Sequence, residues 1–300
     1  MKISFYSLTG IDPTLLFDDI SDSVCEFCSR ILIYFEDTVE HLSVAVLLYI
    51  AICTLLYFCI IKWQYLSFNR EIRHSKRVLF ITAHPDDECM FFGPTILFYT
   101  RKTNCIVFLI CLSTGKNYGM GSTRRKELYI SCKVLGIESS NIFVHNHTLL
   151  PDAIDARWPT AEISQIISHH VEALDITTLV TFDRYGVSQH NNHCSIYYSV
   201  ANLILDRKLP KYCGVYVLDT TNKLRKYWLF LDIPLSLLLS KFRYIIGFQD
   251  RTIIHKAMKK HKSQLVWFRC LYMYFSRYML MNTLQQMNLV DIELDLEIED

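Results

Sequence analysis

The sequence contains few residues that interrupt regular structure, with 9 glycines and 7 prolines among 300 residues. This composition excludes a collagen-like fibre and a low-complexity chain, and no internal repeat is visible. The chain also lacks a strong net charge, which is +1 at pH 7, so composition gives no electrostatic reason to expect nucleic acid as a partner. Hydrophobic residues make up 51% of the chain, and its length allows one large or two small domains with a buried core.

The small net charge conceals an acidic end. Residues 291–300 hold six acids and no base, and the remainder of the chain carries an excess of seven positive charges. We expect residues 285–300 to form an acidic tail outside the main domain.

A run of twenty residues, 42–61, contains no charged side chain. At about 1.5 Å per residue, a helix of this length spans about 30 Å, the thickness of the hydrocarbon core of a bilayer. We therefore predict a single transmembrane helix over 42–61. A buried core helix fits less well, because such helices usually keep a polar stripe and only Ser43 and Thr54 interrupt this run. A cleavable signal peptide is also disfavoured, because 41 residues precede the run and no small-residue cleavage site follows it.

The flanks of this run differ in charge. Residues 62–77 hold five lysines and arginines against one acid, whereas residues 1–41 hold eight acids and two bases. Basic residues are retained on the cytoplasmic side of a membrane. We therefore expect residues 1–41 to be a short lumenal or external segment, 62–77 a connector, and the large C-terminal domain to face the cytosol.

The eleven cysteines agree with a reducing compartment, because their number is odd and the seven from Cys89 onward are scattered in apolar surroundings. Cys25 and Cys28 form an isolated C-x-x-C pair. A disulfide or a metal site is possible there, but we favour neither, because no second pair or histidine lies nearby.

Apolar runs rich in β-branched residues alternate with helical patterns from residue 78 onward. The predicted strands are 78–83, 105–113, 141–145, 176–182 and 213–218. Helical patterns separate them, among them one that ends at Gly136 and others over 159–174 and 193–205. This alternation predicts an α/β fold over residues 78–284, with a Rossmann-like parallel sheet and helices on both faces.

Polar loops follow two of the predicted strands. The first is AHPDDE, residues 83–88, and the second is DRYGVSQHNNH, residues 183–193. In open parallel sheets, chemistry gathers beyond the carboxyl ends of the strands, so these loops should meet at one edge. They offer nitrogen and oxygen ligands suited to zinc, and neither contains sulfur. The candidates are His84, Asp86, Asp87, His190 and His193.

Catalytic zinc typically takes three protein ligands and keeps one position for water, so two of the five candidates would remain for acid and base work. The residue types alone do not select which. Taken separately, each loop is weak evidence for a site. An Asp-Asp pair after a strand is commonly a helix cap or a solvated turn, and the histidines of H-x-x-H often lie at the surface in solvent.

The pair of motifs AHPDDE and TFDRYGVSQHNNH, residues 181–193, resembles the LmbE-like zinc de-N-acetylase family. The resemblance implies that His84, Asp87 and His193 bind zinc and that Asp86 is the general base. It also implies that a protonated His190 helps to stabilise the oxyanion. The donor of a proton to the leaving amine stays open between Asp86 and His190.

Two further residues are expected at the site, Asp183 from its place at the end of a predicted strand and Arg124 from the same resemblance. Asp183 is expected to orient His190 or His193 through a hydrogen bond, with a turn or capping aspartate as an almost equal alternative. Arg124 corresponds to an arginine near the substrate, and its guanidinium could bind a phosphate or a sugar hydroxyl. Some members of the family carry a tyrosine at the position of Ser188, so a tyrosine proton donor is absent here.

The apolar run and the segment 261–284 resemble the membrane-bound eukaryotic members of the family. This implies an inositol glycolipid substrate that carries N-acetylglucosamine, a role in glycosylphosphatidylinositol anchor synthesis, and a location in the endoplasmic reticulum membrane. Residues 241–277 hold nine basic residues, one acid and several aromatic residues, which suits an anionic lipid surface. The apolar stretch 228–239 is too short to span a membrane, and it either lies in the interface or packs internally.

Two alternatives remain at this point. One is a related de-N-acetylase that acts on another amino sugar, which the apolar run and the segment 261–284 disfavour. The other is a catalytically silent lipid-binding or scaffold protein, which the complete set of candidate ligands disfavours.

Overall fold

The computed structural model describes residues 13–62, 75–115, 119–153, 155–290 and 292–293. The chain forms two compact units, one up to Ile52 and one from Cys53 onward. Most of the predicted connector, residues 63–74, lies outside the described residues, as do residues 294–300 of the predicted tail.

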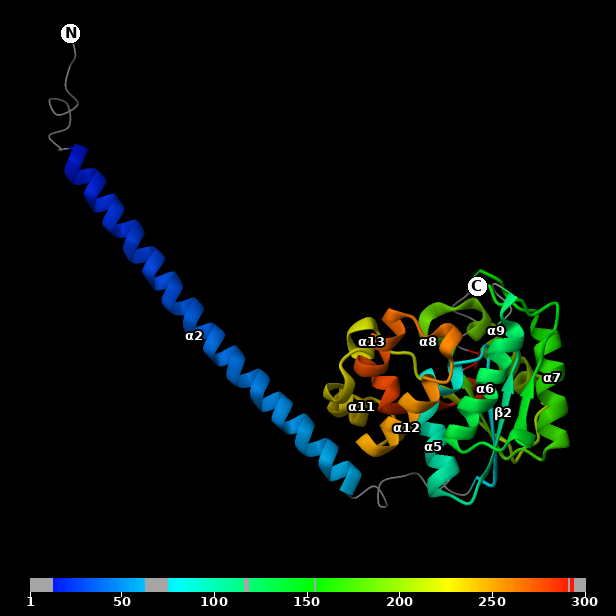
Figure 1. Cartoon of the computed structure of the whole chain (residues 1–300). Helices are drawn as coiled ribbons and strands as arrows, with labels where there is room; N and C mark the ends of the chain where they lie inside the picture. Colours follow the sequence, from blue (N-terminus) through cyan, green and yellow to red (C-terminus); the bar gives the residue numbers. More distant parts are fainter. Residues whose placement is uncertain (1–12, 63–74, 116–118, 154, 291, 294–300) are drawn as a thin grey trace, which may run out of the picture. The chain divides into compact units, whose positions relative to one another are not determined.

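Helix α2 (Pro13–Lys62) contains the predicted transmembrane run and continues beyond it toward the N-terminus (Figure 1). Its part from Asp22 to Lys62 is the one helix among the described residues that is long and apolar enough to cross a membrane. Large apolar side chains along it are exposed, among them Leu47 and Leu55. This exposure is expected of a helix surrounded by lipid and not of a core helix.

The second unit is built on a seven-stranded sheet with the order β3-β2-β1-β4-β5-β7-β6. Five strands form the predicted parallel part, and their bounds agree with the sequence: β1 (Arg77–Thr82), β2 (Ile106–Cys111), β3 (Ile142–Val144), β4 (Thr178–Phe182) and β5 (Gly214–Leu218). Their side chains are almost wholly buried, which explains the continuous apolar runs.

The sequence had indicated a wholly parallel sheet, but the sheet is mixed. Strand β7 (Met281–Gln286) pairs antiparallel with β5 and with β6 (Phe242–Ile245). The sequence concealed β7 because it reads MNTLQQ, and its polar residues Asn282 and Thr283 are buried. The predicted boundary at residue 284 therefore falls inside a strand, and buried Ile292 extends the fold into the predicted tail.

Helices cover both faces of the sheet. Helix α7 (Thr160–Ala173) packs on α9 (Asn191–Leu205), and α6 (Gly121–Leu135) packs with α5 (Gly93–Lys102) and α12 (Phe248–Met258). The remaining helices are α4 (Asp87–Met90), α8 (Gly186–Gln189), α10 (Lys223–Lys226), α11 (Ile233–Leu239) and α13 (Trp267–Phe275), with the 3-10 helices η2 (Ser139–Asn141), η3 (Leu229–Asp232), η4 (Lys262–Gln264) and η5 (Arg277–Met279).

The stretch 228–239 forms η3 and α11, and part of it packs internally. Asp232 is fully buried, where it accepts from Arg225 Nε at 2.7 Å and pairs with Arg277 Nη1 at 2.6 Å. The structure thus supports internal packing for the residues around Asp232, whereas Trp228 at the start of the stretch and Leu238 and Leu239 at its end are exposed.

Strand order also brings the two polar loops together. Strand β1 pairs with β4, with Val78 opposite Thr178 and Phe80 opposite Val180. The two strands are parallel, so their carboxyl ends lie at the same edge of the sheet. The loop that follows β1 and the loop that follows β4 therefore meet, as the sequence predicted.

Candidate metal and catalytic site

The loop after β1 is held by hydrogen bonds to its own acidic side chains. Oδ2 of Asp87 accepts from the backbone N–H groups of Ala83 (3.0 Å) and His84 (2.8 Å). Asp86 precedes α4 with φ of 107°, a left-handed conformation that is uncommon for residues other than glycine. Such strain is tolerated where the surrounding structure enforces it, and it clusters at functional sites.

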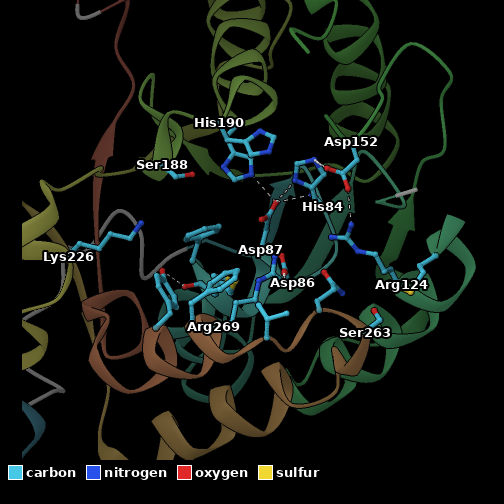
Figure 2. Close-up of a pocket in the computed structure, with 18 of the residues that line it drawn as sticks. His84, Asp86, Asp87, Arg124, Asp152, Ser188, His190, Lys226, Ser263 and Arg269 are labelled. Atoms are coloured by element: carbon cyan, nitrogen blue, oxygen red, sulfur yellow. Dashed lines mark hydrogen bonds and ion pairs between the residues drawn. The ribbon is translucent and has the colours of Figure 1, made fainter. Parts of the chain in front are cut away.

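Three of the predicted residues converge in this site. The Oδ2 atom of Asp87 lies 3.4 Å from Nε2 of His193 and 3.9 Å from Nδ1 of His84. All three side chains are buried, and one ligand atom from each lies within 4.8 Å of the others. This arrangement is the His-Asp-His group that the resemblance implied for a metal, and Figure 2 labels two of its members, His84 and Asp87.

The outer nitrogen of each histidine has a partner that sets its orientation. His193 Nδ1 lies 3.0 Å from the carbonyl oxygen of Gly186, and its ring stacks on Phe182 with centroids 4.0 Å apart. His84 Nε2 lies 3.1 Å from Oδ1 of Asp152 and 3.0 Å from the side-chain amide nitrogen of Asn192. Metal-binding histidines usually donate their other N–H to a carbonyl or a carboxylate, and Gly186 and Asp152 offer such acceptors here. Both rings therefore turn their remaining nitrogen toward Asp87.

The chemistry of the donor set fits a metal ion. Nε2 of His193 is buried and makes no hydrogen bond, although buried polar atoms are almost always paired. Burial lowers the pKa of His84 to about 4, which keeps its imidazole neutral. Burial tends to raise the pKa of Asp87, but His193 and His84 beside it hold that pKa well below its usual range. Burial tends to lower the pKa of His193, but Asp87 beside it raises that pKa above its usual range, so a cation bound at Nε2 would replace a proton there. Neutral imidazole and ionised carboxylate are the forms that bind a divalent cation.

Asp86 has a different environment from Asp87. Burial raises the pKa of Asp86 to about 6, against the opposing effect of Arg269, which forms an ion pair with its Oδ2. Adjacent carboxylates with pKa values displaced in opposite directions are typical of sites that divide binding and proton transfer between two acids.

His190 caps the N-terminus of α9 and lies beside both other histidines. Its ring centroid is 5.0 Å from that of His84 and 4.9 Å from that of His193. The backbone N–H of Asn192 donates to Nδ1 of His190 at 3.3 Å, so the proton of the neutral ring sits on Nε2. Burial and the neighbouring His193 lower the pKa of His190. The ring is therefore a neutral N–H donor, and not the imidazolium that we had expected.

Asp183 does not have the expected partner. Its oxygens accept from the backbone of Tyr185 (3.1 Å) and Gly186 (3.0 Å), and from the backbone N–H (2.7 Å) and hydroxyl (2.6 Å) of Thr220. It is the turn aspartate of the alternative interpretation, and it reaches His193 only indirectly, because it holds the loop that presents the Gly186 carbonyl.

Arg124 lines the site, but its guanidinium is bound by protein. It donates to Oδ2 of Asp152 (2.8 Å) and to the carbonyl oxygens of Gly115 (3.1 Å) and Pro85 (3.2 Å). Asp152 in turn faces His84. No sequence pattern indicated Asp152, because a single aspartate between two predicted elements is normally a solvated loop residue.

A second buried ion pair joins the loop after β1 to the C-terminal part of the chain. His261 Nε2 lies 2.7 Å from Oε1 of Glu88, and both side chains are fully buried. The other oxygen of Glu88 accepts from the backbone N–H of Asp86 at 3.0 Å. This pair fixes the segment that leads into α13, from which Arg269 reaches Asp86. The pairing spans more than 170 residues, so no local pattern indicated it.

The site opens into a cavity of about 720 Å³. His84, Asp86, Asp87 and His190 lie at one side of it, and Lys226 and Arg269 reach toward it from the C-terminal elements (Figure 2). Its lining comprises His84, Asp86, Asp87, Met90, Phe91, Met120, Arg124, Asp152, Ser188, His190, His193, Lys226, Tyr227, Ser263, Gln264, Val266, Phe268, Arg269 and Tyr272.

Comparison with known proteins agrees with this geometry. The family model described as PIG-L, GlcNAc-PI de-N-acetylase, matches residues 79–204, which include both polar loops. N-acetylglucosaminyl-phosphatidylinositol de-N-acetylase of Bos taurus is 43% identical over 233 residues, which are 75% of this chain and 92% of that protein. The chain belongs to the GlcNAc-PI de-N-acetylase family. The resemblance inferred from the two loop motifs is therefore confirmed.

More distant members of the GlcNAc-PI de-N-acetylase family match over a similar length. A probable N-acetylglucosaminyl-phosphatidylinositol de-N-acetylase of Schizosaccharomyces pombe is 37% identical over 73% of this chain and 90% of that protein. Among solved structures, the N,N'-diacetylchitobiose deacetylase of Pyrococcus horikoshii superposes with a TM-score of 0.55 at 15% identity, over 79% of this chain and 93% of that one. This likeness confirms the predicted fold.

Proposed function

We propose that this chain removes the acetyl group from N-acetylglucosaminyl-phosphatidylinositol, with release of glucosaminyl-phosphatidylinositol and acetate, in glycosylphosphatidylinositol anchor synthesis. The observation that carries the proposal is the buried convergence of His84, Asp87 and His193 beside Asp86 and His190, at the head of a cavity. The relatives that match most of the chain support the substrate by their names.

We assign the metal site to His84, Asp87 and His193, and the metal to Zn²⁺, because two imidazoles and one carboxylate are a donor set typical of catalytic zinc. Another divalent ion could use the same ligands. When bound, such an ion supplies a Lewis acid and lowers the pKa of a coordinated water to about 7. Arg124 donates to Asp152, and Asp152 in turn orients the His84 ring.

Two side chains carry out the proton transfers. Asp86 takes the proton of the attacking water as the new C–O bond forms, and its raised pKa suits both uptake and return of a proton near neutrality. The Nε2–H of His190 donates a hydrogen bond to the acetyl oxygen as negative charge develops there. When the C–N bond breaks, Asp86 returns its proton to the leaving amine, and the enzyme regains its starting state.

Lys226 is the residue that we assign to the phosphodiester of the substrate. Its Nζ lines the cavity and lies 5.6 Å from the ring centroid of Tyr272. Among the described residues it has no carboxylate partner within ion-pair distance, unlike Arg124 and Arg269, and burial lowers its pKa. A partly desolvated ammonium group without a counter-ion is suited to an anionic ligand.

The function and this assignment are tested together with two substrates in detergent micelles. The wild-type chain should release acetate from N-acetylglucosaminyl-phosphatidylinositol, and Lys226→Met should lower kcat/KM by about tenfold to a hundredfold, the effect of one charge-assisted contact. On N-acetylglucosaminyl-inositol without phosphate the two proteins should be equal. Lys223→Met, in an exposed residue of the same helix, is the control. No acetate from the wild type would refute the function, and an equal loss on both substrates would refute the role of Lys226.

We further propose that the chain is a single-pass protein of the endoplasmic reticulum membrane, with the catalytic unit in the cytosol. The basic flank after α2 and the acidic segment before it support this orientation. Protease added to sealed microsomes should therefore digest the chain after Lys62 and spare an N-terminal fragment. Protection of the catalytic unit would contradict the assignment.

A further inference from the structure

Helix α13 exposes an aromatic and aliphatic face. Trp267, Phe268, Leu271, Tyr274 and Phe275 are each between 50% and 74% exposed, and their spacing places them on one side of the helix. An ordinary surface helix turns charged and polar residues outward. This set, named here the aromatic face, is therefore a contiguous apolar surface of the kind that marks an interaction site.

The opposite side of α13 is firmly attached to the domain. Tyr272 and Met273 are buried, and the Tyr272 hydroxyl donates to the carbonyl oxygen of Met90 at 3.1 Å. Nε2 of His255 lies 2.8 Å from the carbonyl oxygen of Met273, and Arg269 pairs with Asp86. The helix cannot turn its aromatic face inward without breaking these contacts.

The aromatic face lies at the margin of the cavity. Phe268 belongs both to the face and to the cavity lining, and Arg269 and Tyr272 of the same helix also line the cavity. A partner that covers the aromatic face would therefore lie beside the opening of the active site.

Contacts through α12 link α13 to the end of α2. The last ten residues of α2 belong to the second unit, where the Tyr57 ring lies 5.3 Å from that of Phe248. Phe248 begins α12 and is half exposed, and one turn later Arg251 donates to the carbonyl oxygens of Met273 (3.0 Å) and Tyr274. The chain thus connects the end of a candidate membrane span with α13 through a single helix.

The charge around α13 suits an anionic surface. No acid occurs between residues 251 and 290, and four lysines in the segment before α13 are exposed: Lys256, Lys259, Lys260 and Lys262. Basic residues near an anionic membrane favour association with it. Tryptophan and tyrosine beside such residues are typical of the membrane–water interface.

We propose that the aromatic face lies in the headgroup layer of the membrane and seats the opening of the cavity against the bilayer. The inference rests on the proposed function, because it assumes a glycolipid substrate. It explains how the sugar could enter the cavity while the acyl chains stay in lipid. It adds a second membrane contact, independent of α2, whose partner is the lipid surface.

The test uses the full chain reconstituted in vesicles with anionic phospholipid. Trp267→Ser combined with Leu271→Ser removes two residues of the face that do not line the cavity. On N-acetylglucosaminyl-phosphatidylinositol embedded in the vesicles, this variant should lose at least about tenfold in kcat/KM, because two large apolar side chains are no longer buried in the headgroup layer. On a short-chain, water-soluble form of the same substrate it should equal the wild type. Ile130→Ser, at a half-exposed residue of α6, should change neither rate.

A second measurement does not depend on activity. Phospholipids brominated near the headgroup should quench part of the tryptophan fluorescence of the wild type, and Trp267→Phe should remove that part. Three results would overturn the proposal: rates of the double variant equal to those of the wild type on both substrates, an equal loss on both substrates, or no quenching at Trp267. Each would point to a protein partner or a second copy on this face. Failure of the proposed function would be distinct, because the wild type would then release no acetate from either substrate.

Discussion

Asp86→Asn should lower kcat by about a hundredfold to ten-thousandfold, the usual contribution of a general base, and should leave the bound metal in place. The amide keeps the size of the carboxylate, and asparagine tolerates the left-handed backbone of this position. It cannot accept the proton of the attacking water. The ligand atoms of His84, Asp87 and His193 are untouched, so metal content per chain should equal that of the wild type.

The pH profile gives an independent measure of the same residue. Asp86 must be ionised to act as a base, so kcat/KM of the wild type should fall as the pH drops through a value at or below about 6. A bound cation would lower this value further. The acid limb should be absent in Asp86→Asn. Asp206→Asn, at a surface ion pair with Lys208, is the matched control and should leave rate, profile and metal unchanged. Full activity of Asp86→Asn with bound metal would refute the role of Asp86.

His193→Ala should abolish bound metal and activity together. The substitution removes one of three ligands, and its effect on metal affinity should exceed the 10- to 100-fold that loss of an outer partner typically costs. Nε2 of His193 is buried and lies 3.4 Å from Oδ2 of Asp87, so the substitution removes a ligand atom from the centre of the group.

Metal content by atomic emission and acetate release should be measured on the same preparation of each variant. Circular dichroism shows whether the fold survives the loss of the ring that stacks on Phe182. The exposed residue His147 supplies the control, and His147→Ala should behave as the wild type. Stoichiometric metal in a folded His193→Ala protein would show that His193 is not a ligand.

Local patterns predicted the parallel half of the fold well. Strands such as β1 and β4 are buried on both faces, and this burial produces the continuous apolar runs by which they were located. The order of elements then placed the two polar loops at one edge of the sheet, because parallel neighbours end on the same side. The antiparallel strand β7 escaped this reasoning, because its buried asparagine and threonine interrupt the apolar pattern. Asn282 accepts from Thr95, 187 residues away, and Thr283 accepts from Arg277 in the adjoining η5.

The partners of the site residues were less predictable than the residues themselves. His84, Asp87 and His193 stand in two short motifs, whereas Asp152 and Arg269 carry no motif and act only because the fold brings them to His84 and Asp86. For Asp183 the predicted partner was wrong. Its position at a strand end suggested a histidine, but its carboxylate binds Thr220.

By itself the sequence determined the elements that short-range chemistry dictates: an apolar run of membrane length, the alternation of buried strands and helices, and the side chains capable of binding a metal. The tertiary structure alone decided which atoms meet. The pKa of Asp86 depends on burial and on Arg269, 183 residues away, and the tautomer of His190 depends on the cap of α9. Electrostatic and hydrogen-bond energies fall off over a few ångströms in space, whatever the separation along the chain, so such contacts leave no periodic signal in the sequence.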